Sequence, residues 1–371
     1  MRKWAISSAC FLVLVGLVMV ASQPTERAAA QPKPITWKVQ STWPAGVPPH
    51  ISFLELAKKV EEMSGGRLKW EVLPAGAVVP AFEILDAINR GVLDGGHGVP
   101  AYWIGKHEAS SLFGTSPGFG MDSWDNLAWM YYGGGLELYH DLLQKEMKMN
   151  VVSFPTSPLP SQAFGWFKKE PIKSPAELRG LKYRTVGLAA DLYKEMGAAL
   201  TILPIGEVIP AIERGVLDAA EVCCPTVDKI LGFPDPLKAY MVKSLHQPAE
   251  FLELIVSKSK WDDLPRDLKA VVKYAVMAEA ADFYMRDLKM NMQDLEEMVV
   301  KKGVKVSETP PAILKAQLEA WDKVLDRKAK ANPFFAKVVE SQKEWAKRAV
   351  PYRQVFATPR DIQFEYYWKR R

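Results

Sequence analysis

The residue whose type and position most suggest chemistry is Arg184, which lies in the run LKYRTVG at residues 181–187. This run has the pattern of a short strand closed by a glycine, and a helical pattern follows it at residues 189–196. Arg184 therefore falls at or near the carboxyl end of a strand, the edge of an open α/β sheet at which ligands bind. Its guanidinium is a planar fork of donors that fits a carboxylate through two hydrogen bonds. Two interpretations stay open: a clamp for an anionic ligand, or an ordinary surface arginine paired with a carboxylate.

Glu221 is the second candidate, because it ends the run DAAE at residues 218–221 and lies among alanine, valine and cysteine. A carboxylate in such surroundings needs a partner if it is buried. Arg184 is one such partner, and the pair would then be a structural salt bridge. A bound cation is another, with Gln162 and backbone carbonyl oxygens completing a shell of oxygen ligands. The residues alone leave both alternatives open.

His97 lies in the glycine-rich run DGGHG at residues 94–98 and is a further candidate for contact with a ligand, although a lone histidine is more often structural. The sequence has no Gly-x-Ser-x-Gly, no His-Glu-x-x-His, and no Gly-x-Gly-x-x-Gly that opens a helix after a strand. We therefore expect a protein that is not an enzyme. An exported enzyme stays open as an alternative, and it would need His97 or Glu221 as a general base near Arg184.

Two distant segments carry nearly the same sequence. Residues 83–94 (EILDAINRGVLD) and 207–218 (EVIPAIERGVLD) align without a gap and are identical at eight of twelve positions. Each follows a Pro-x-Gly and has the pattern of a short amphipathic helix that turns through glycine into a strand. We interpret the match as a repeated architectural unit, with chance similarity as the alternative. Two similar lobes with a ligand between them are the simplest arrangement that explains the repeat.

The order of the predicted elements is typical of an α/β protein. Strand patterns at 35–41 and 68–73 flank a helical pattern at 50–63, which predicts a parallel βαβ unit. Residues 266–302, which follow Pro265, contain neither Gly nor Pro and predict one helix of about 57 Å over 265–302, long enough to span two lobes, with two kinked helices as the alternative. The predicted parts are a signal peptide at 1–30, a first lobe at 35–158 completed by about 248–265, a second lobe at 159–247, the lobe-spanning helix at 265–302 and a helical tail at 303–371.

Apolar residues recur at helical spacing in these last two parts. In the long helix they are Tyr284, Leu288, Met292, Leu295 and Val299. The tail shows two helical patterns, at 311–332 and 333–348, and each carries an apolar stripe. Such stripes must be buried, either against the lobes or against another subunit.

The N-terminus has the pattern of a signal peptide. Arg2 and Lys3 precede an apolar run at residues 5–21, and three alanines at 28–30 offer a cleavage site. An uncleaved membrane anchor is the alternative, but the run is short for a span and polar residues follow it. We therefore expect an exported protein. Its net charge of +5 is too mild to suggest a nucleic-acid partner, and no basic run is interleaved with aromatic residues.

Cleavage of the signal peptide would remove Cys10 and leave the adjacent pair Cys223 and Cys224. Adjacent cysteines rarely bridge each other because the geometry is strained. Two neighbouring thiols with few histidines do not suggest a metal site either. We expect small buried side chains at both positions.

Taken together, these segments resemble the substrate-binding proteins of tripartite ATP-independent periplasmic (TRAP) transporters, the DctP-like solute-binding family, and most closely the branch that binds 2-oxo acids such as pyruvate. The resemblance covers nearly all of the chain after the signal peptide. The matching pieces are MSGGRL at 63–68, PAG at 74–76, YWIGK at 102–106, Gln162-x-x-x-Trp166-Phe167, LRGLKYR at 178–184, Gly197, DAAE at 218–221 and LGF at 231–233.

The resemblance implies a two-lobed periplasmic binding protein fold, with mixed, mostly parallel sheets, that closes on a small organic acid and delivers it to TRAP membrane permease subunits. It implies that Arg184 grips the carboxylate and that Tyr102 lines the pocket. It also implies a cation, Na⁺ or Ca²⁺, held by Gln162, Glu221 and the carbonyl of Val222. A homodimer formed by exchange of a C-terminal helix is a further expectation, and a ligand-sensing subunit of the same fold is a further alternative.

This sequence departs from the family pattern at two places. Residues 222–224 are Val-Cys-Cys where the branch usually carries tryptophan or other bulky or polar residues. Gln247 stands before Pro248 where we expect an acidic residue, and it is the remaining candidate ligand for the cation.

Overall fold

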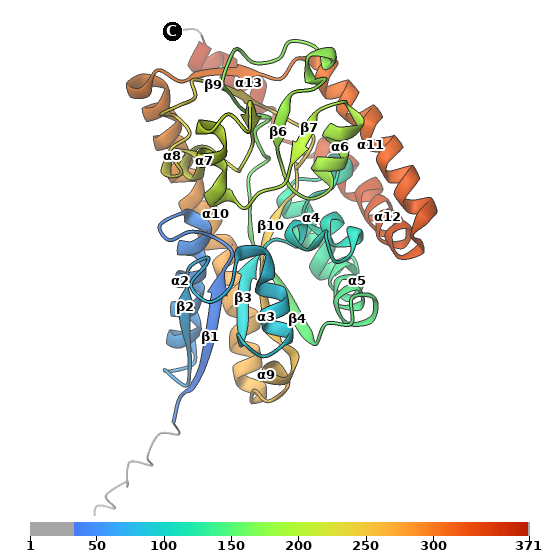
Figure 1. Ribbon diagram of the computed structural model, residues 1–371. Helices are drawn as coiled ribbons and strands as arrows, with labels where there is room; N and C mark the ends of the chain where they lie inside the picture. The colour runs from blue at the N-terminus through green and yellow to red at the C-terminus, as the bar shows by residue number, and fades with distance from the viewer. Residues whose placement is uncertain (1–32, 370–371) are drawn as a thin grey trace, which may run out of the picture. The chain divides into compact units, whose positions relative to one another are not determined.

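The computed structural model describes residues 33–369, so the predicted signal peptide at 1–30 lies outside the described residues. The chain divides into two units, Met1–Pro34 and Ile35–Arg371. The second unit contains two β-sheets, each accompanied by helices (Figure 1). This arrangement confirms the α/β class with two lobes and mixed sheets. Among the residues that the structure describes, no helix is long and apolar enough to cross a bilayer.

The first sheet has five strands in the order β2-β1-β3-β10-β4. Its strands are β1 (Ile35–Ser41), β2 (Leu68–Leu73), β3 (Gly95–Gly98), β4 (Val151–Pro158) and β10 (Phe251–Ser257). β1 pairs in parallel with β2 and β3, since helix α2 (Pro48–Met63) returns the chain to the same end of the sheet. β10 arrives from much later in the chain and pairs antiparallel with β3 and β4. Strands from distant parts of the sequence therefore share one sheet.

The second sheet has six strands in the order β11-β9-β5-β8-β6-β7. Its strands are β5 (Gly165–Phe167), β6 (Lys182–Arg184), β7 (Ala199–Thr201), β8 (Ala219–Ala220), β9 (Ala239–Val242) and β11 (Lys305–Glu308). β6 is parallel to β7 and β8, whereas β5 is antiparallel to β8 and β9. The chain passes from the first sheet to the second after β4 and returns before β10. Two short connections, at residues 159–164 and 243–250, join the lobes, and the longer segment at residues 258–304 joins β10 of the first sheet to β11 of the second.

The repeated sequence forms the same structure twice. One copy builds α3 (Ile84–Asn89) and leads into β3, and the other builds α7 (Val208–Glu213) and leads into β8. The final aspartate of each copy makes the same backbone hydrogen bond. The nitrogen of Asp94 donates to the carbonyl of Lys38, and the nitrogen of Asp218 donates to the carbonyl of Lys182, each over 2.8 Å. The prediction of a repeated architectural unit is confirmed. It makes β6 of the second sheet the counterpart of β1 in the first.

The long helix α10 (Arg266–Lys302) is continuous, as the sequence predicts. It contacts α2 and β4 on the side of the first sheet and α8 (Pro225–Ile230) on the side of the second. Its buried face is made of Leu268, Val272, Ala275, Val276, Ala280, Phe283 and Met298. The stripe that stands out in the sequence is a different face: its members Tyr284, Leu288, Met292 and Val299 are 41–61% exposed. α10 therefore carries apolar residues at helical spacing on two faces, and the lobes cover the face that begins at Leu268.

The tail folds back on the lobes. α11 (Pro311–Ala331) contacts α6 (Leu188–Glu195), and α12 (Pro333–Val355) contacts α5 (Gly135–Asp141) (Figure 1). The lobes therefore bury most of the tail stripe, namely Ile313, Trp321, Leu325, Phe335 and Val338. The remaining helices are α4 (Ser123–Tyr132), α9 (Lys258–Asp262) and α13 (Arg360–Phe364), the last followed by one π-helical turn at Glu365–Lys369. This terminal segment is exposed throughout.

Candidate functional site

A small cavity lies where segments of both lobes meet, with a volume of about 20 Å³. Tyr102 and Glu250 contribute to its lining from segments next to the first sheet, and Arg184 and Val222 from the second. Gln247 adds to it from the connection between the lobes. A volume of this size holds about one water molecule. A larger solute therefore needs the lobes to move apart or the lining side chains to shift.

Arg184 ends strand β6, as the sequence predicts, and its side chain is only 1% exposed. Its Nε and Nη2 donate to the carbonyl of Leu203 over 3.0 and 2.7 Å. Its Nη1 donates to the carbonyl and to the side-chain Oε1 of Glu221 over 2.7 and 3.3 Å. Arginine carries five N–H donors, and Nη2 has two of them. The guanidinium is therefore fixed in place at the cavity while one Nη2 hydrogen is left for a further acceptor.

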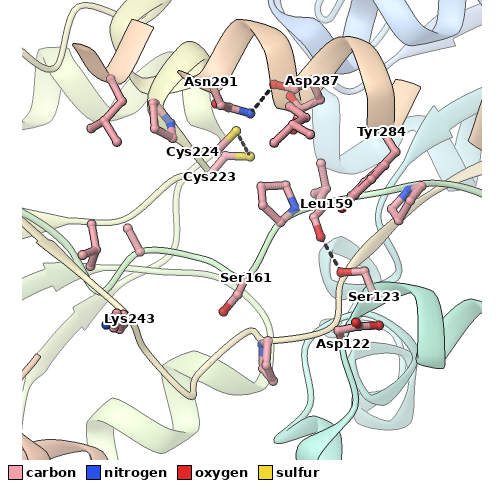
Figure 2. A pocket seen from close by; sticks show the side chains of 18 of the residues that line it. Asp122, Ser123, Leu159, Ser161, Cys223, Cys224, Lys243, Tyr284, Asp287 and Asn291 are labelled. Atoms are coloured by element: carbon pink, nitrogen blue, oxygen red, sulfur yellow. Dashed lines mark hydrogen bonds between the residues drawn. The ribbon is translucent and has the colours of Figure 1, made fainter. Parts of the chain in front are cut away.

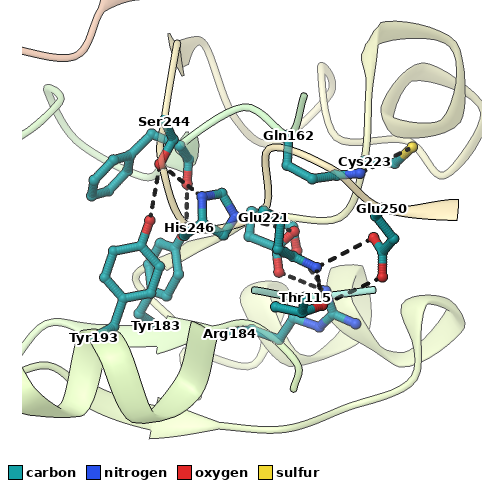
Figure 3. A network of polar contacts seen from close by, with 12 residues as sticks. Thr115, Gln162, Tyr183, Arg184, Tyr193, Glu221, Cys223, Ser244, His246 and Glu250 are labelled. Atoms are coloured by element: carbon teal, nitrogen blue, oxygen red, sulfur yellow. Dashed lines mark hydrogen bonds and ion pairs between the residues drawn. The ribbon is translucent and has the colours of Figure 1, made fainter. Parts of the chain in front are cut away.

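Glu221 is buried beside Arg184, and the two form an ion pair. Burial acts to raise the pKa of Glu221, but His246 and Arg184 act against it and hold that pKa below its ordinary value. The carboxylate is therefore ionised. Its Oε2 has no hydrogen bond among the described residues and lies 3.9 Å from Nε2 of His246. Figure 3 shows Glu221 between Arg184 and His246, with Gln162 and Glu250 nearby.

Oxygen atoms gather around Gln162. One terminal atom of its side-chain amide lies 3.3 Å from the carbonyl oxygen of Val222 and 2.9 Å from that of Cys223. With the amide nitrogen at this position, the contacts are hydrogen bonds. With the amide oxygen there, three oxygens converge as they do around a bound cation. The backbone nitrogen of Gln162 also donates to the carbonyl of Gln247 over 3.1 Å, which ties the two glutamines together.

Buried side-chain oxygens at this place that have no hydrogen-bond partner among the described residues include Oε2 of Glu221 and Oε1 of Gln247. Buried oxygens without a donor are costly unless a cation or a ligand satisfies them. Together with Gln162 and the carbonyl of Val222 they are a donor set that fits a hard cation. Residues 33–369 contain no group of three or more His, Cys, Asp and Glu side chains that could hold a metal. A cation here would depend mainly on neutral oxygens and one carboxylate.

Glu250 is a cavity residue that the sequence did not single out. Thr115 donates to its Oε1 over 3.4 Å and Gln247 to its Oε2 over 3.3 Å. Burial, together with the charge of Glu221, raises the pKa of Glu250 to about 8. A signal was present, because Glu250 is one of two acidic residues in the otherwise uncharged run QPAEFLELIV at 247–256. Its approach to Arg184 depends on how β10 inserts into the first sheet, which the sequence pattern does not specify.

Tyr102 lines the cavity, as the resemblance implies. Its ring lies 5.4 Å from that of Trp43 and 4.7 Å from that of Phe82, so packing fixes its position. Burial raises the pKa of the Tyr102 hydroxyl, with Arg184 acting in the opposite direction. The hydroxyl therefore stays protonated and can donate a hydrogen bond.

His97 is placed differently from the other candidates. It lies in β3, is fully buried and stacks on Phe53 with ring centroids 4.8 Å apart. His97 does not line the small cavity; Glu221 and Gln162 do not line it either, but they contact its lining residues Arg184 and Val222. Burial, and then the nearby His50, lower the pKa of His97 to about 3, so the ring is neutral. In the repeat His97 is the counterpart of Glu221, and the second copy pairs this position with Arg184, whereas the first copy stacks it on Phe53.

A larger cavity of about 380 Å³ shares Leu159 and Cys223 with the small one. Figure 2 shows it between the segment at residues 122–124, the cysteine pair and the exposed side of α10. Tyr284 and Leu288 of the exposed α10 stripe contribute to its lining. The lining is mostly apolar, so this cavity is suited to an apolar or aromatic occupant rather than to a small anion.

Comparison with known proteins gives three consistent matches. Residues 39–332 match the model of the DctP family, described as bacterial extracellular solute-binding protein, family 7. A monocarboxylate 2-oxoacid-binding periplasmic protein of Nostoc sp. is 30% identical over 354 residues, which are 95% of this chain and 96% of the relative. A TRAP periplasmic solute binding protein from Pseudoalteromonas atlantica, with bound sodium and pyruvate, has a TM-score of 0.82 at 30% identity and covers 91% of this chain and 100% of its own.

A further solved structure adds a second cation and an assembly. It is a TRAP transporter solute binding protein from Bordetella bronchiseptica, a mixed-occupancy dimer in which one site holds copurified calcium and picolinate and the other is empty. Its TM-score is 0.84 at 26% identity, and the alignment covers 91% of this chain and 99% of that one.

Proposed function

We propose a function from one premise: the chain belongs to family 7 of the bacterial extracellular solute-binding proteins, the DctP family. It is a solute-binding receptor of a TRAP transporter, and the solute proposed here is a small monocarboxylate of the 2-oxo acid type, such as pyruvate. The Nostoc relative is a 2-oxoacid-binding protein, and the Pseudoalteromonas structure holds pyruvate. Both observations support this class of solute.

One observation carries the proposal: Arg184 is held immobile at a cavity between the lobes. Its contacts with Leu203 and Glu221 fix the guanidinium before any solute arrives, so little side-chain entropy is lost on binding. In a site closed to water the attraction between this cation and a carboxylate is stronger than in solution. The Tyr102 hydroxyl is a further donor, and the small cavity favours an acid with few heavy atoms.

A cation is the second part of the proposed site. Gln162, Glu221, Gln247 and the carbonyl of Val222 would hold it, and oxygens of the solute would complete its shell. A bound cation satisfies Oε2 of Glu221 and Oε1 of Gln247, which lack hydrogen-bond partners. It also holds oxygens of the solute in place next to Arg184. Relatives hold sodium with pyruvate and calcium with picolinate. Because this site has one ionised carboxylate and several neutral oxygens, Na⁺ fits it better than Ca²⁺.

In this account the protein binds and releases its solute unchanged. The alternative, an exported enzyme acting on the same acids, needs a base beside Arg184. Of the two candidate bases, His97 lies elsewhere and Glu221 is engaged with Arg184. Recovery of pyruvate unchanged after prolonged incubation with the protein distinguishes the receptor from the enzyme.

Delivery follows from the two-lobed architecture. The connections at residues 159–164 and 243–250 are the natural hinge, since they are the short chain segments that join the two sheets. We expect the lobes to close on the solute in the periplasm and to present the closed form to the TRAP membrane permease. Export by the predicted signal peptide at 1–30 would bring the protein to that compartment.

A homodimer is the proposed assembly, and its proposed contact is the C-terminal segment of one chain on the α10 stripe of the other. The terminal segment exposes Ile362, Phe364, Tyr367 and Trp368, which is unusual for so short a stretch of surface. The α10 stripe is equally exposed and borders the large apolar cavity. Each apolar surface would cover the other, and the dimeric relative from Bordetella supports the arrangement.

The test of the solute and of Arg184 is isothermal titration calorimetry with pyruvate, lactate and acetate in sodium buffer. The expected result is tightest binding for pyruvate and no measurable binding for the Arg184→Ala variant. Arg214→Ala is the matched control, because Arg214 belongs to the same lobe and is exposed. Circular dichroism of both variants must show an intact fold. Unchanged pyruvate affinity in Arg184→Ala would remove the proposed role of this residue.

A further inference from the structure

The adjacent cysteines, Cys223 and Cys224, are the only cysteines among the described residues and remain unassigned by the solute site. They follow Glu221 and Val222 at the end of β8, and Cys224 is the N-cap residue of α8. Their sulfur atoms lie 2.8 Å apart, so the side chains point toward each other rather than to opposite sides of the chain. They are 6% and 3% exposed.

The cysteine pair lies between two cavities. Both cysteines line the large apolar cavity (Figure 2), and Cys223 also lines the small cavity, to which Arg184 contributes. The large cavity is bordered by exposed residues of α10, which gives small reagents a route to the sulfurs. A small reagent can therefore reach the pair from solvent through the large cavity. A chemical change at the pair can in turn affect the solute site at the small cavity.

Burial limits which reagents can reach the pair, since both side chains are buried and the route to them runs through the large cavity. Oxidation of the pair therefore depends on thiol–disulfide exchange with a small disulfide.

We propose that Cys223 and Cys224 form a reversible disulfide with each other, and that this bond alters the solute site. The oxidant is a small-molecule disulfide that can enter the large cavity, because the exported protein would meet an oxidising compartment. One cysteine loses its proton and attacks this disulfide, which forms a mixed disulfide and releases the first oxidant thiol. The second cysteine loses its proton, attacks the sulfur of the first and releases the second oxidant thiol. The pair gives up two electrons and two protons, and the oxidant becomes a dithiol.

Two physical arguments favour this outcome over permanent thiols or a permanent bond. The second cysteine is already in contact with the first, so the closing step is intramolecular and has a high effective concentration. A disulfide between adjacent residues is strained, and strained disulfides are readily reduced. The pair is therefore suited to switching rather than to permanent stabilisation.

The backbone connects the pair to the solute site. The ring that the new bond closes contains the peptide between residues 223 and 224, so that peptide must reorient. The carbonyl oxygens of Val222 and Cys223 both contact the amide of Gln162, and the carbonyl of Glu221 accepts from Arg184. The backbone nitrogen of Cys223 donates to Asp228 over 3.3 Å. Oxidation would therefore shift groups that hold the cation and position the clamp. This consequence for the solute rests on the proposed function.

The first measurement concerns the bond itself and needs no solute. The full-length mature protein, exported and purified without reductant, is treated with oxidised glutathione, unfolded and alkylated, and its intact mass is recorded. The expected mass is lower by two hydrogen atoms than that of the reduced protein, with no alkyl group added; dithiothreitol should restore two alkylated cysteines. Two alkylated cysteines without reductant, or a glutathione adduct that persists on the native protein, would overturn the proposal.

Single variants provide the matched control. Cys223→Ser and Cys224→Ser each lack the resolving thiol and should stop at the glutathione adduct. Serine is compatible with the N-cap position at residue 224. If a single variant forms no glutathione adduct while the native protein forms its disulfide, the result still supports the proposal, because it shows that the reaction requires both thiols. A native protein that remains fully reduced alongside two adduct-forming variants would contradict intramolecular closure.

The second measurement concerns the effect on the site. Hydrogen exchange of residues 221–231 is compared between oxidised and reduced protein without solute, and pyruvate affinity is then measured for both forms. The expected results are a change in exchange and a change in affinity of about fivefold or more, the lower end of typical coupling between sites. Unchanged exchange and affinity in a protein shown to carry the bond would overturn the switch. If neither form binds pyruvate, the proposed solute is wrong, while the mass and exchange measurements still decide the disulfide.

Discussion

Arg184 occupies the position in the second sheet that Gln40 occupies in the first. Gln40 donates through Nε2 to the carbonyl of Val79 over 2.7 Å, and Arg184 donates through Nη2 to the carbonyl of Leu203 over 2.7 Å. Both acceptors directly precede a proline and the repeated helix. The repeated unit thus anchors a long polar side chain at each site. Arginine keeps this anchor and adds a positive charge and a second set of donors at the cavity.

Arg184→Gln is therefore a sharper test of the clamp than truncation to alanine. Glutamine is the residue that the first copy already uses at this position, so the backbone anchor to Leu203 can persist. We expect a loss of pyruvate binding free energy of about 2–5 kcal/mol, as for removal of one partner from a buried charged pair. Calorimetry measures this loss. Gln40→Ala, at the matching position of the first sheet, is the control. A loss of pyruvate affinity in Gln40→Ala but not in Arg184→Gln would contradict the assignment.

The same substitution leaves Glu221 as a buried charge without its partner. Breaking a buried ion pair costs about 3–5 kcal/mol of folding free energy. We expect Arg184→Gln to lower the unfolding free energy by an amount of this order, and the double variant Arg184→Gln with Glu221→Gln to recover most of it. Urea denaturation of the four proteins provides the comparison as a double-mutant cycle. Additive effects of the two substitutions would mean that the pair does not interact.

The proposed cation leads to a prediction with its own readout. Replacing sodium by a large organic cation and adding a chelator should weaken pyruvate binding at least about tenfold, which corresponds to about 1.4 kcal/mol. Melting temperature should rise with added Na⁺ even without pyruvate, because a ligand that binds only the folded state stabilises it. Glu221→Gln should abolish this rise. Binding that is indifferent to both treatments would remove the cation from the account.

Gly187 lies at a contact between the lobes. The backbone nitrogen of Leu188 donates to Ser111 over 2.8 Å, and a Cβ added at Gly187 would lie 2.5 Å from the Ser111 hydroxyl. Its φ of +61° also disfavours any other residue. We expect Gly187→Ala to weaken solute binding by holding the lobes apart. Gly180→Ala is the matched control, since Gly180 has a φ of +74° and open space around it. Both variants should lose stability, but only Gly187→Ala should lose affinity.

The raised pKa of Glu253 predicts how the free energy of unfolding depends on pH. Burial raises its pKa to about 7 in the folded protein, against an ordinary value of 4.5 and in spite of donors from Ser153, Trp103 and Tyr139. Between these two values the folded state holds a proton that the unfolded state has lost, so stability falls as pH rises from 4.5 to 7. We expect Glu253→Gln to flatten this fall in part and to raise stability at pH 8. Its amide can accept from Trp103 and Tyr139 and donate to Ser153.

Urea denaturation at pH 5 and pH 8 measures this effect for the native protein and for Glu253→Gln. Glu296→Gln is the control, because Glu296 is exposed on α10. Parallel pH profiles for the native protein and Glu253→Gln would show that Glu253 does not carry the proton.

The dimer has a prediction of its own. Removal of residues 357–371 should convert the protein to a monomer in light scattering at micromolar concentration, and Leu288→Glu on the α10 stripe should do the same. Tyr274→Glu is the control, since Tyr274 is exposed on the same helix outside the lining of the large cavity. A truncated protein that stays dimeric would assign the contact to another surface.

The sequence was informative wherever the signal was local or repeated. The repeated segment predicted matching helix and strand units, and the pattern around Arg184 put that residue at a strand end, where the structure has it. Periodicity revealed the α10 stripe but could not tell which face the lobes cover, because a second set of apolar residues, which includes Leu268, Val272 and Val276, recurs at helical spacing on the same helix. Glu250 was missed because its place depends on β10 entering the first sheet from far along the chain. The contact between Cys223 and Cys224 depends on rotamers, which spacing does not determine.

The most direct test of the central claim is a crystal structure of the protein with pyruvate and sodium. We predict one carboxylate oxygen of pyruvate within about 3 Å of Nη2 of Arg184, a normal distance for a charged hydrogen bond. The contacts of Arg184 with Leu203 and Glu221 should remain. Pyruvate bound with its carboxylate away from Arg184, for example in the large cavity beside α10, would contradict the account.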